Sequence, residues 1–292
     1  MANASPIASI TSGVRAAYEQ LLAILFTPKD LPGCIVWLRP TLGLGKTGTL
    51  LASWTDQAQG RVLTAPSVVE RPSLVDSSAP LNGRAAIRFA GVGEVLIQQD
   101  APALPFEKEP FSAFALVSPA TIGLEHGWPL AWFGKDGSAH AGLEVDGSGV
   151  FQAWLETHLT SGVTLMPNKP TLVGLVYDGD EASLYVNGKL VVSVPGLALY
   201  VEPGPSPRLV VGGQTGVSFP FHGDLGDVSV FDRALAPAEI TTLATMLMRY
   251  YRMKDGTPKW LDGLEGLIGK LGGWARSLGR LFDSAIERLA GR

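Results

Sequence analysis

Residues 221–251 place a strand directly before a helix, and this order constrains the fold more than any other feature of the sequence. Apolar residues such as Val228 and Val230 alternate with polar ones up to Phe231, as in a strand with one buried face. A charged turn follows, and Pro237 and Glu239 then mark the first turn of a helix. We therefore expect the last strand of a β-sheet to be closed by a short helix.

The composition favours many short strands over a helical bundle, because 35 glycines and 21 prolines interrupt the chain. Apolar residues make up 46% of the sequence, which is ample for the core of one large sandwich or of two small domains. The formal net charge of −4 excludes an overall electrostatic attraction to nucleic acid. A single cysteine, Cys34, permits no internal disulfide and favours folding in a reducing compartment, or a core that needs none.

Three parts follow one another along the chain. In the first, residues 1–30, apolar side chains at helical spacing over 7–26 predict an amphipathic helix. The second, residues 31–251, holds short alternating runs between turns and ends with the helix described above. The third, residues 252–292, begins with a hinge and continues as a final amphipathic segment. We thus expect one β-domain between two helical extensions.

Several strands and one hairpin can be assigned within the middle part. The clearest expected strands are Ala85–Phe89, Phe111–Val117, Gly149–Leu155, Thr171–Tyr177, Ser183–Val186, Lys189–Val194 and Leu209–Val211. Asn187-Gly188 lies between two of these runs and predicts a tight hairpin, because both turn positions need a positive φ.

Four stretches in this order resemble the laminin G-like, concanavalin A-like jelly rolls of bacterial exoproteins and phage structural proteins. They are Leu31–Leu38, Leu81–Phe89, Val176–Lys189 and Phe221–Leu235. The resemblance implies an all-β, concanavalin A-like jelly-roll sandwich over 31–251. The periodicity described above adds flanking N- and C-terminal amphipathic helices. Such domains mostly bind glycans or proteins, and a minority are glycosidases. Arg39 and Ala90 stand where this group usually has acidic residues, which argues against a cation site there.

The segment Glu144-Val145-Asp146 invites comparison with jelly-roll endoglucanases, which carry two catalytic carboxylates on one strand. Retaining hydrolysis needs one carboxylate as nucleophile and one as acid/base. Here the acid/base position falls at or near Gly149, and Asp146 is better explained as a turn residue. We therefore expect no catalytic residues and no enzyme.

Neither histidine nor aspartate spacing predicts a metal site. The histidines lie in four separate segments, at His126, His140, His158 and His222. Asp136, Asp178 and Asp180 adjoin glycines and are explained as turn formers rather than calcium ligands. We expect no metal and no cofactor.

Trp154 is the strongest candidate for a binding residue. Residues 143–145 and 151–155 alternate so that both apolar sets face one core if a three-residue loop with a glycine bulge joins them. Trp154 then lies on the opposite, polar face, as an aromatic platform for a sugar ring. The candidate glycan face comprises Trp154, Gln152, Glu144, Glu156 and His140. A second core layer, cover from a loop, or a protein contact are the alternatives.

The carboxy-terminal segment carries a broad apolar helical face. Its candidate anchor residues are Trp260, Leu264, Leu267, Leu271, Trp274, Leu278 and Phe282. Six glycines between Trp260 and Phe282 lower its helix propensity, so the face needs a partner. The segment after residue 257 has a net charge of +2 with mixed signs, which suits protein packing better than a membrane surface. Sister subunits of a homo-oligomer, or other subunits of an assembly, are the preferred partners.

These observations lead to one functional hypothesis and two alternatives. The first 30 residues lack a basic n-region, so we expect no secretion signal, and no run of 18 apolar residues predicts a membrane span. We expect a non-enzymatic structural and adhesion protein on the head or tail surface of a phage or phage-like particle. Assembled into the virion in the host cytoplasm, its lectin-like jelly roll would bind a host-surface glycan for attachment. A bacterial carbohydrate-binding protein and a glycoside hydrolase are the alternatives.

Overall fold

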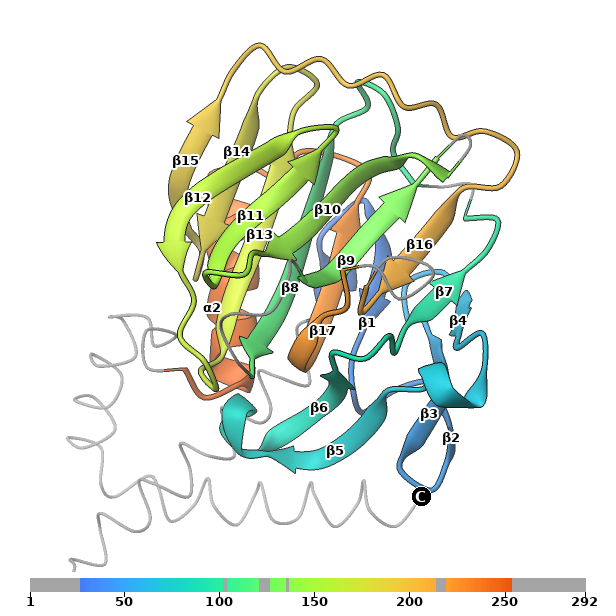
Figure 1. Ribbon diagram of the computed structural model, residues 1–292. Helices are drawn as coiled ribbons and strands as arrows, with labels where there is room; N and C mark the ends of the chain where they lie inside the picture. The colour runs from blue at the N-terminus through green and yellow to red at the C-terminus, as the bar shows by residue number, and fades with distance from the viewer. Residues whose placement is uncertain (1–26, 102–103, 121–126, 135–136, 214–218, 254–292) are drawn as a thin grey trace, which may run out of the picture.

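The computed structural model describes residues 27–101, 104–120, 127–134, 137–213 and 219–253. This part of the chain contains seventeen strands and one α-helix, α2 (Pro237–Tyr250), with short 3-10 turns at Pro28–Asp30, Val68–Glu70 and Ala79–Leu81. The strands pair into one continuous sheet that folds into two facing layers (Figure 1), so the expected all-β jelly roll is confirmed. Each layer is called a sheet below. The helices expected before residue 27 and after residue 257 lie outside the described residues.

One sheet is named here the helix-side sheet, because α2 packs on its outer surface. β17 (His222–Phe231) lies at its centre and pairs along one side with β8 (Phe111–Pro119). Its other side pairs first with β6 (Arg84–Ala90) and then with β1 (Cys34–Leu38). β5 (Ser73–Ser78) extends the sheet beyond β6. Beyond β8 follow β13 (Thr171–Tyr177), β14 (Ala182–Val186) and β15 (Lys189–Val194).

The other sheet is named the aromatic-side sheet, after the side chains on its outer surface. Its antiparallel order begins β12 (His158–Thr164), β11 (Val150–Leu155), β10 (Ala139–Val145), β9 (Gly127–Phe133) and β16 (Arg208–Val211). It continues through β7 (Leu96–Gln98), β4 (Val62–Thr64), β3 (Leu50–Thr55) and β2 (Leu44–Thr47). A pairing of Leu50 with Ser73 joins the two sheets at one side.

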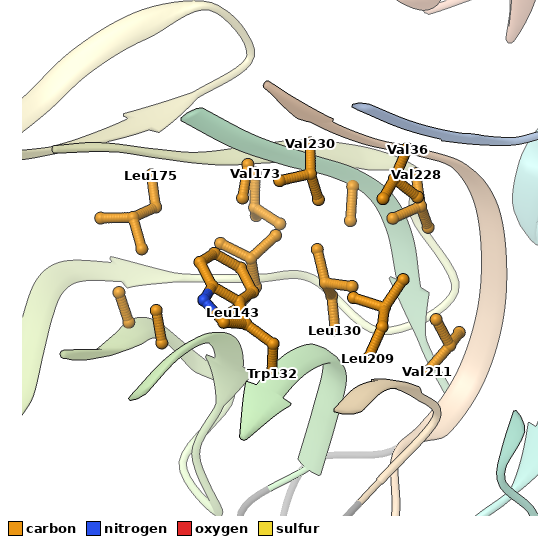
Figure 2. Packing of buried hydrophobic residues seen from close by; sticks show 14 of the residues in the cluster. Val36, Leu130, Trp132, Leu143, Val173, Leu175, Leu209, Val211, Val228 and Val230 are labelled. Carbon is orange, nitrogen blue, oxygen red and sulfur yellow. The ribbon is translucent and has the colours of Figure 1, made fainter. Parts of the chain in front are cut away.

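The main hydrophobic core lies between the sheets (Figure 2). Val173, Val228 and Val230 enter it from the helix-side sheet, and Leu143 and Trp132 enter it from the aromatic-side sheet. These side chains are essentially inaccessible to water, and the Trp132 indole donates a hydrogen bond to the Pro105 carbonyl at 3.0 Å. Burial of this apolar surface is the main force that holds the sheets together.

Two loops fold as their sequences predict. Asn187 and Gly188 have φ values of 51° and 76°, which matches a type I′ turn between β14 and β15. The Asp146 amide donates to the Val150 carbonyl, which leaves the three residues 147–149 in the loop between β10 and β11. Gly149 there has a φ of 80°, as a glycine bulge requires. The loop keeps the alternation of both strands in phase.

Helix α2 covers the outer surface of the helix-side sheet. Leu243 and Leu247 of the helix pack with Phe114, Leu116 and other sheet residues in a second buried cluster. The carboxylate of Glu239 accepts the Ala236 amide at the start of the helix and forms a bidentate pair with Arg233. Hydrogen bonds from Arg233 lower the pKa of Glu239 to about 2. No described helix is long and apolar enough to cross a membrane.

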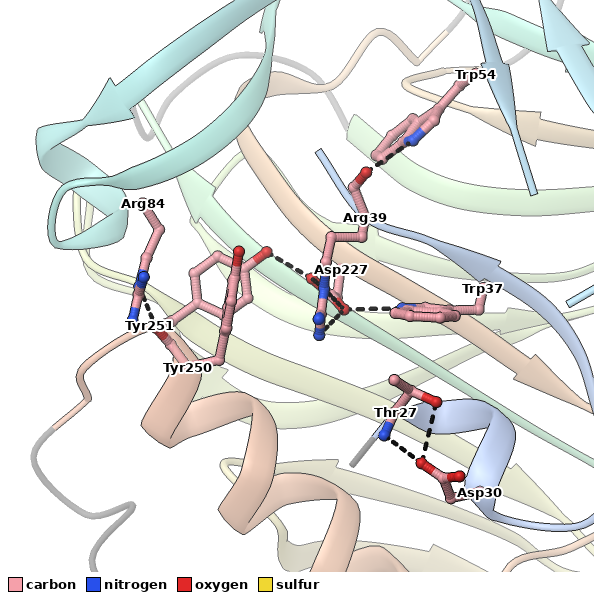
Figure 3. Close-up of polar contacts among 9 residues, drawn as sticks. All are labelled: Thr27, Asp30, Trp37, Arg39, Trp54, Arg84, Asp227, Tyr250 and Tyr251. Atoms are coloured by element: carbon pink, nitrogen blue, oxygen red, sulfur yellow. Dashed lines mark hydrogen bonds and ion pairs between the residues drawn. The ribbon is translucent and has the colours of Figure 1, made fainter. Parts of the chain in front are cut away.

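A buried polar network fastens the end of α2 to the sheet (Figure 3). Asp227 is 1% exposed and accepts hydrogen bonds from the Trp37 indole (2.9 Å), the Tyr251 hydroxyl (2.7 Å) and the guanidinium of Arg39. The Arg39 guanidinium stacks on Trp37 and, at 4.4 Å, on the ring of Tyr250. Burial raises the pKa of Tyr251 well above its ordinary value, so its hydroxyl keeps the proton it donates. Arg39 thus supplies the charge that balances Asp227.

Candidate functional site

The outer surface of the aromatic-side sheet holds the predicted platform, Trp154. Its strand β11 pairs with β10 so that Trp154 lies opposite Gly142 and Gln152 lies opposite Glu144. The intervening residues Ala153 and Leu143 face the core. Trp154, Gln152 and Glu144 therefore share the outer face, as their alternation predicts.

The indole of Trp154 extends across β10. Its N–H donates to the Ala139 carbonyl at 3.0 Å, three residues before Gly142. Gly142, opposite Trp154, has no side chain, and a Cβ there would collide with the Leu130 carbonyl and Ala131 of β9. The indole remains half-buried and lies with its centroid 6.0 Å from that of Trp128, at an interplanar angle of 32°. Trp154 is thus fixed against the sheet rather than free to rotate.

A third apolar cluster lies next to Trp154 on the same surface. Its buried members are Val95, Ile97, Trp128, Ala131, Phe133 and Val210. Trp128 stacks between Phe133 and Phe219, and Trp154 packs at the border of the cluster. A second core layer was one of the alternatives for Trp154, and the structure contains such a layer, with Trp154 only partly inside it.

Polar groups line the other side of Trp154. His158 on β12 lies directly opposite Trp154, with its ring 4.8 Å away and edge-on at 80°. Its Nδ1 is 3.0 Å from a carboxylate oxygen of Glu144, which is fully buried, whereas the His158 side chain is 49% exposed. Gln152 donates its amide to Asp146 at 2.9 Å. Hydrogen-bond donors and acceptors therefore lie along one side of the indole.

Two predicted members of the face lie elsewhere. A register shift between Ala139 and Ala141 interrupts the alternation of β10, and it turns His140 into the core, where its ring lies 5.1 Å from that of Phe106. Glu156 follows the end of β11 with a φ of 56°, so it leaves the strand instead of continuing its face. The expected placement of His140 and Glu156 beside Trp154 is therefore wrong.

His140 and Glu156 instead form a structural pair. The His140 Nδ1 lies 3.3 Å from the Glu156 carboxylate, which also accepts the amides of Tyr200 and Val201. Burial lowers the pKa of His140 to about 4, although Glu156 acts in the opposite direction. The imidazole is thus neutral at neutral pH, and Glu156 holds the loop at 200–201 against the end of β11.

His158 is the member of the face that alternation within β10 and β11 did not reveal. It belongs to the next strand, and only the two-residue turn at 156–157 brings it opposite Trp154. The short interval between two alternating runs is the signal for this pairing. Trp128 comes from β9 and has no local signal of this kind, since a bulge shifts its strand against β10.

The acidic pair considered for catalysis is tied into the structure. Glu144 is buried against His158, and Asp146 accepts the amides of Ser148 and Val150 in the loop. Among the described residues no group of three or more histidine, cysteine, aspartate or glutamate side chains is placed to hold a metal ion. Burial raises the pKa of Cys34 to about 12, which keeps its thiol protonated and unreactive. The anchor residues from Trp260 to Phe282 lie outside the described residues.

Comparisons with solved structures identify the same architecture in other proteins. A sialidase from Trypanosoma rangeli matches with a TM-score of 0.54 and 15% identity over 84% of this chain, which corresponds to 40% of the sialidase. Domain 4 of an extracellular arabinanase from Geobacillus stearothermophilus, in complex with arabinotriose, matches with a TM-score of 0.52 and 13% identity, over 72% of this chain and 98% of that domain. The binding domain of Paraclostridial Mosquitocidal Protein 1 also gives a TM-score of 0.52, at 13% identity over 74% of this chain and 52% of that one. At these identities the likeness concerns the fold.

Sequence comparison places the domain in a family. None of the curated proteins compared matches this sequence. Residues 98–241, which run from β7 into α2, match the model of the concanavalin A-like lectin/glucanases superfamily. Residues 98–241 therefore belong to a laminin G-like domain of the concanavalin A-like lectin/glucanases superfamily.

Proposed function

We propose that the jelly roll binds carbohydrate on the outer face of the aromatic-side sheet, with Trp154 as the stacking platform. The observation that carries the proposal is the half-buried indole laid across β10 beside His158 and Gln152. An aromatic face bears negative potential and attracts the polarised C–H groups of a sugar ring. The imidazole of His158 and the amide of Gln152 are then the hydrogen-bonding groups for the sugar hydroxyls.

The role is proposed to be binding without catalysis. Glu144 is fully buried and Asp146 serves the loop, so neither carboxylate is free to act as nucleophile or acid/base. Purified protein is expected to release no reducing ends from polysaccharides of a glycan panel. Sustained hydrolysis that is lost in Glu144→Gln would refute this part of the proposal.

A glycan array followed by titration calorimetry tests the binding face. The wild type should bind at least one glycan, Trp154→Ala should lose that binding, and Trp154→Phe should retain a weakened form of it. Val191→Ala on the exposed edge strand β15 is the matched control and should bind as the wild type does. Equal binding by Trp154→Ala and the wild type would show that the ligand, if any, is held elsewhere.

We further propose that the domain is displayed on a phage or phage-like particle, where it attaches to host-surface glycans. The support is the combination of a lectin-like fold with the apolar pattern of residues 258–292, which suits docking onto sister subunits. Electron microscopy of native assemblies labelled with an antibody to the jelly roll tests this setting. Labelling of particle heads or tails is the expected result, and a free or cell-surface protein would favour a bacterial carbohydrate-binding protein.

A further inference from the structure

A second candidate site lies on the sheet opposite the one that carries Trp154. A cavity of about 300 Å³ opens on the outer surface of the helix-side sheet, where β6, β17 and β8 run side by side. Asp224 of β17 pairs in register with Arg88 on one side and with Ser118 on the other. All three residues line the cavity, which Pro80 and Asn168 help to enclose.

The alternation of the strands places these three side chains on the outer surface. Leu116 lies two residues before Ser118, and Ala86 lies two residues before Arg88, and both pack in the cluster under α2. Residues two apart share a face, so Ser118 and Arg88 continue that surface beyond the apolar cluster. Along these strands the outer surface thus changes from an apolar region that packs against α2 to a polar cavity.

Asp224 is held rigidly at the floor of the hollow. It is 2% exposed, and its two oxygens accept Arg88 Nε at 2.6 Å and Arg88 Nη2 at 2.8 Å. The hydroxyl of Ser78 donates to Asp224 as well, and the same hydroxyl accepts the Leu81 amide at 3.1 Å. Arg88 remains 45% exposed and has three further N–H donors. The pair is neutral as a whole but presents directed donors to the cavity.

The Ser118 hydroxyl indicates that the cavity lacks a hydrogen-bonding partner. The residue is 1% exposed, and its hydroxyl has no hydrogen-bond partner among the described residues. A buried hydroxyl without a partner is unfavourable, and native proteins contain few of them. Since Ser118 lines the cavity, a ligand hydroxyl seated there would supply the missing partner.

Asn168 stands at the border of the cavity. Its backbone lies in the left-handed region at φ 55°. Its backbone amide donates to the Pro119 carbonyl at 2.7 Å, and its side-chain amide donates to the Ala120 carbonyl at 3.4 Å. These bonds tie the loop before β13 to the end of β8, and the wall of the cavity is therefore built into the fold.

We propose that this cavity binds a single neutral sugar ring or a similar polyol, independently of the face around Trp154. The volume is at the small end of the range of about 300 to 1,000 Å³ for ligand sites, so it suits one ring rather than a chain. The internal Arg88–Asp224 pair leaves no net charge for an ionic ligand. Hydroxyl groups, which both donate and accept, match the orphaned Ser118 hydroxyl and the guanidinium donors.

Saturation-transfer NMR and calorimetry on the full chain test the site, with D-glucose, D-galactose, D-mannose and L-arabinose as neutral probes and inorganic phosphate and D-glucuronate as anionic ones. At least one neutral sugar should bind. Ser118→Ala should weaken it about tenfold through loss of one hydrogen bond. Ser118→Leu should abolish it by filling the cavity, with near-native thermal unfolding as the check on folding.

Trp154→Ala separates this site from the proposed function, because it should leave monosaccharide binding in the cavity unchanged. Binding that disappears in Trp154→Ala and persists in both Ser118 variants would assign the sugar to the other face and overturn the inference. Binding of the anions alone, or of no probe, would overturn it as well, and in the latter case the hollow holds only water.

Discussion

The two outer surfaces of this sandwich are covered in different ways. On the helix-side sheet, α2 buries an apolar cluster, and the network around Asp227 locks the end of the helix to β1 and β17. On the aromatic-side sheet, a buried cluster of aromatic rings lies on the outer side, with Trp154 and His158 partly exposed at its border. Apart from the cavity beside Arg88, Ser118 and Asp224, the first surface is covered by the protein itself. The second presents half-buried rings beside hydrogen-bonding groups, which is the composition of a ligand-binding surface.

The largest effect is expected where the covered surface is locked. Asp227→Ala leaves the Arg39 charge unpaired in a buried position and removes the acceptor of Trp37 and Tyr251. Breaking such a pair costs about 3–5 kcal/mol, which should appear in the free energy of urea unfolding. The double variant Arg39→Met, Asp227→Leu removes both charges and should be more stable than the single variant. A single variant with near-native stability would mean that α2 needs no such lock.

The second test concerns His140, which is buried beneath the outer surface of the aromatic-side sheet. His140 has a pKa of about 4 in the folded protein against 6.5 for the free side chain, because burial favours its neutral form. As the pH falls below 6.5, the unfolded chain takes up a proton that the folded chain excludes. Stability should therefore be complete above pH 6.5 and decline by about 3 kcal/mol down to pH 4, as urea unfolding at each pH would measure.

His140→Gln is the control for this decline, since it removes the titrating group and should flatten the slope between pH 6.5 and 4. Glu239 contributes mainly at lower pH, because its pKa is lowered from 4.5 to about 2 and the stabilisation from its pair with Arg233 is lost only below pH 4.5. An unchanged slope in His140→Gln would assign the decline to other groups.

These contrasts also explain what the sequence could predict. The hairpin at 187–188, the loop at 147–149 and helix α2 depend on neighbouring residues, and their signals are local. The predicted position of His140 is wrong because a bulge in β10 reverses the alternation, and the sequence near 139–141 contains no local signal for this bulge. The cavity is built by Arg88, Ser118 and Asp224, which lie on three strands far apart in the sequence. Only the pairing of β17 with both β6 and β8 brings them together.

A smaller effect is expected from truncation on the open surface. Trp154 is half-buried with one hydrogen bond, so Trp154→Ala should lower the free energy of unfolding by only about 1–2 kcal/mol. Leu243→Ala, its counterpart under α2, removes a fully buried side chain and should cost about 2–5 kcal/mol. Only the Trp154 variant should lose glycan binding. If it is as destabilised as the Leu243 variant, Trp154 is core packing and the two surfaces are equivalent.

The smallest effect on the fold is expected from deletion of residues 258–292. The last backbone hydrogen bond of the described residues joins the Met253 amide to the Met248 carbonyl, so a cut after residue 257 leaves α2 and its network intact. We expect an unchanged free energy of urea unfolding for the truncated chain, because both outer surfaces keep the contacts described above. The full chain, with its apolar row from Trp260 to Phe282, should self-associate in light scattering, and the truncated chain should be monomeric. Unfolding of the truncated chain together with a monomeric full chain would instead mean that the segment completes the cover of one sheet and is no anchor.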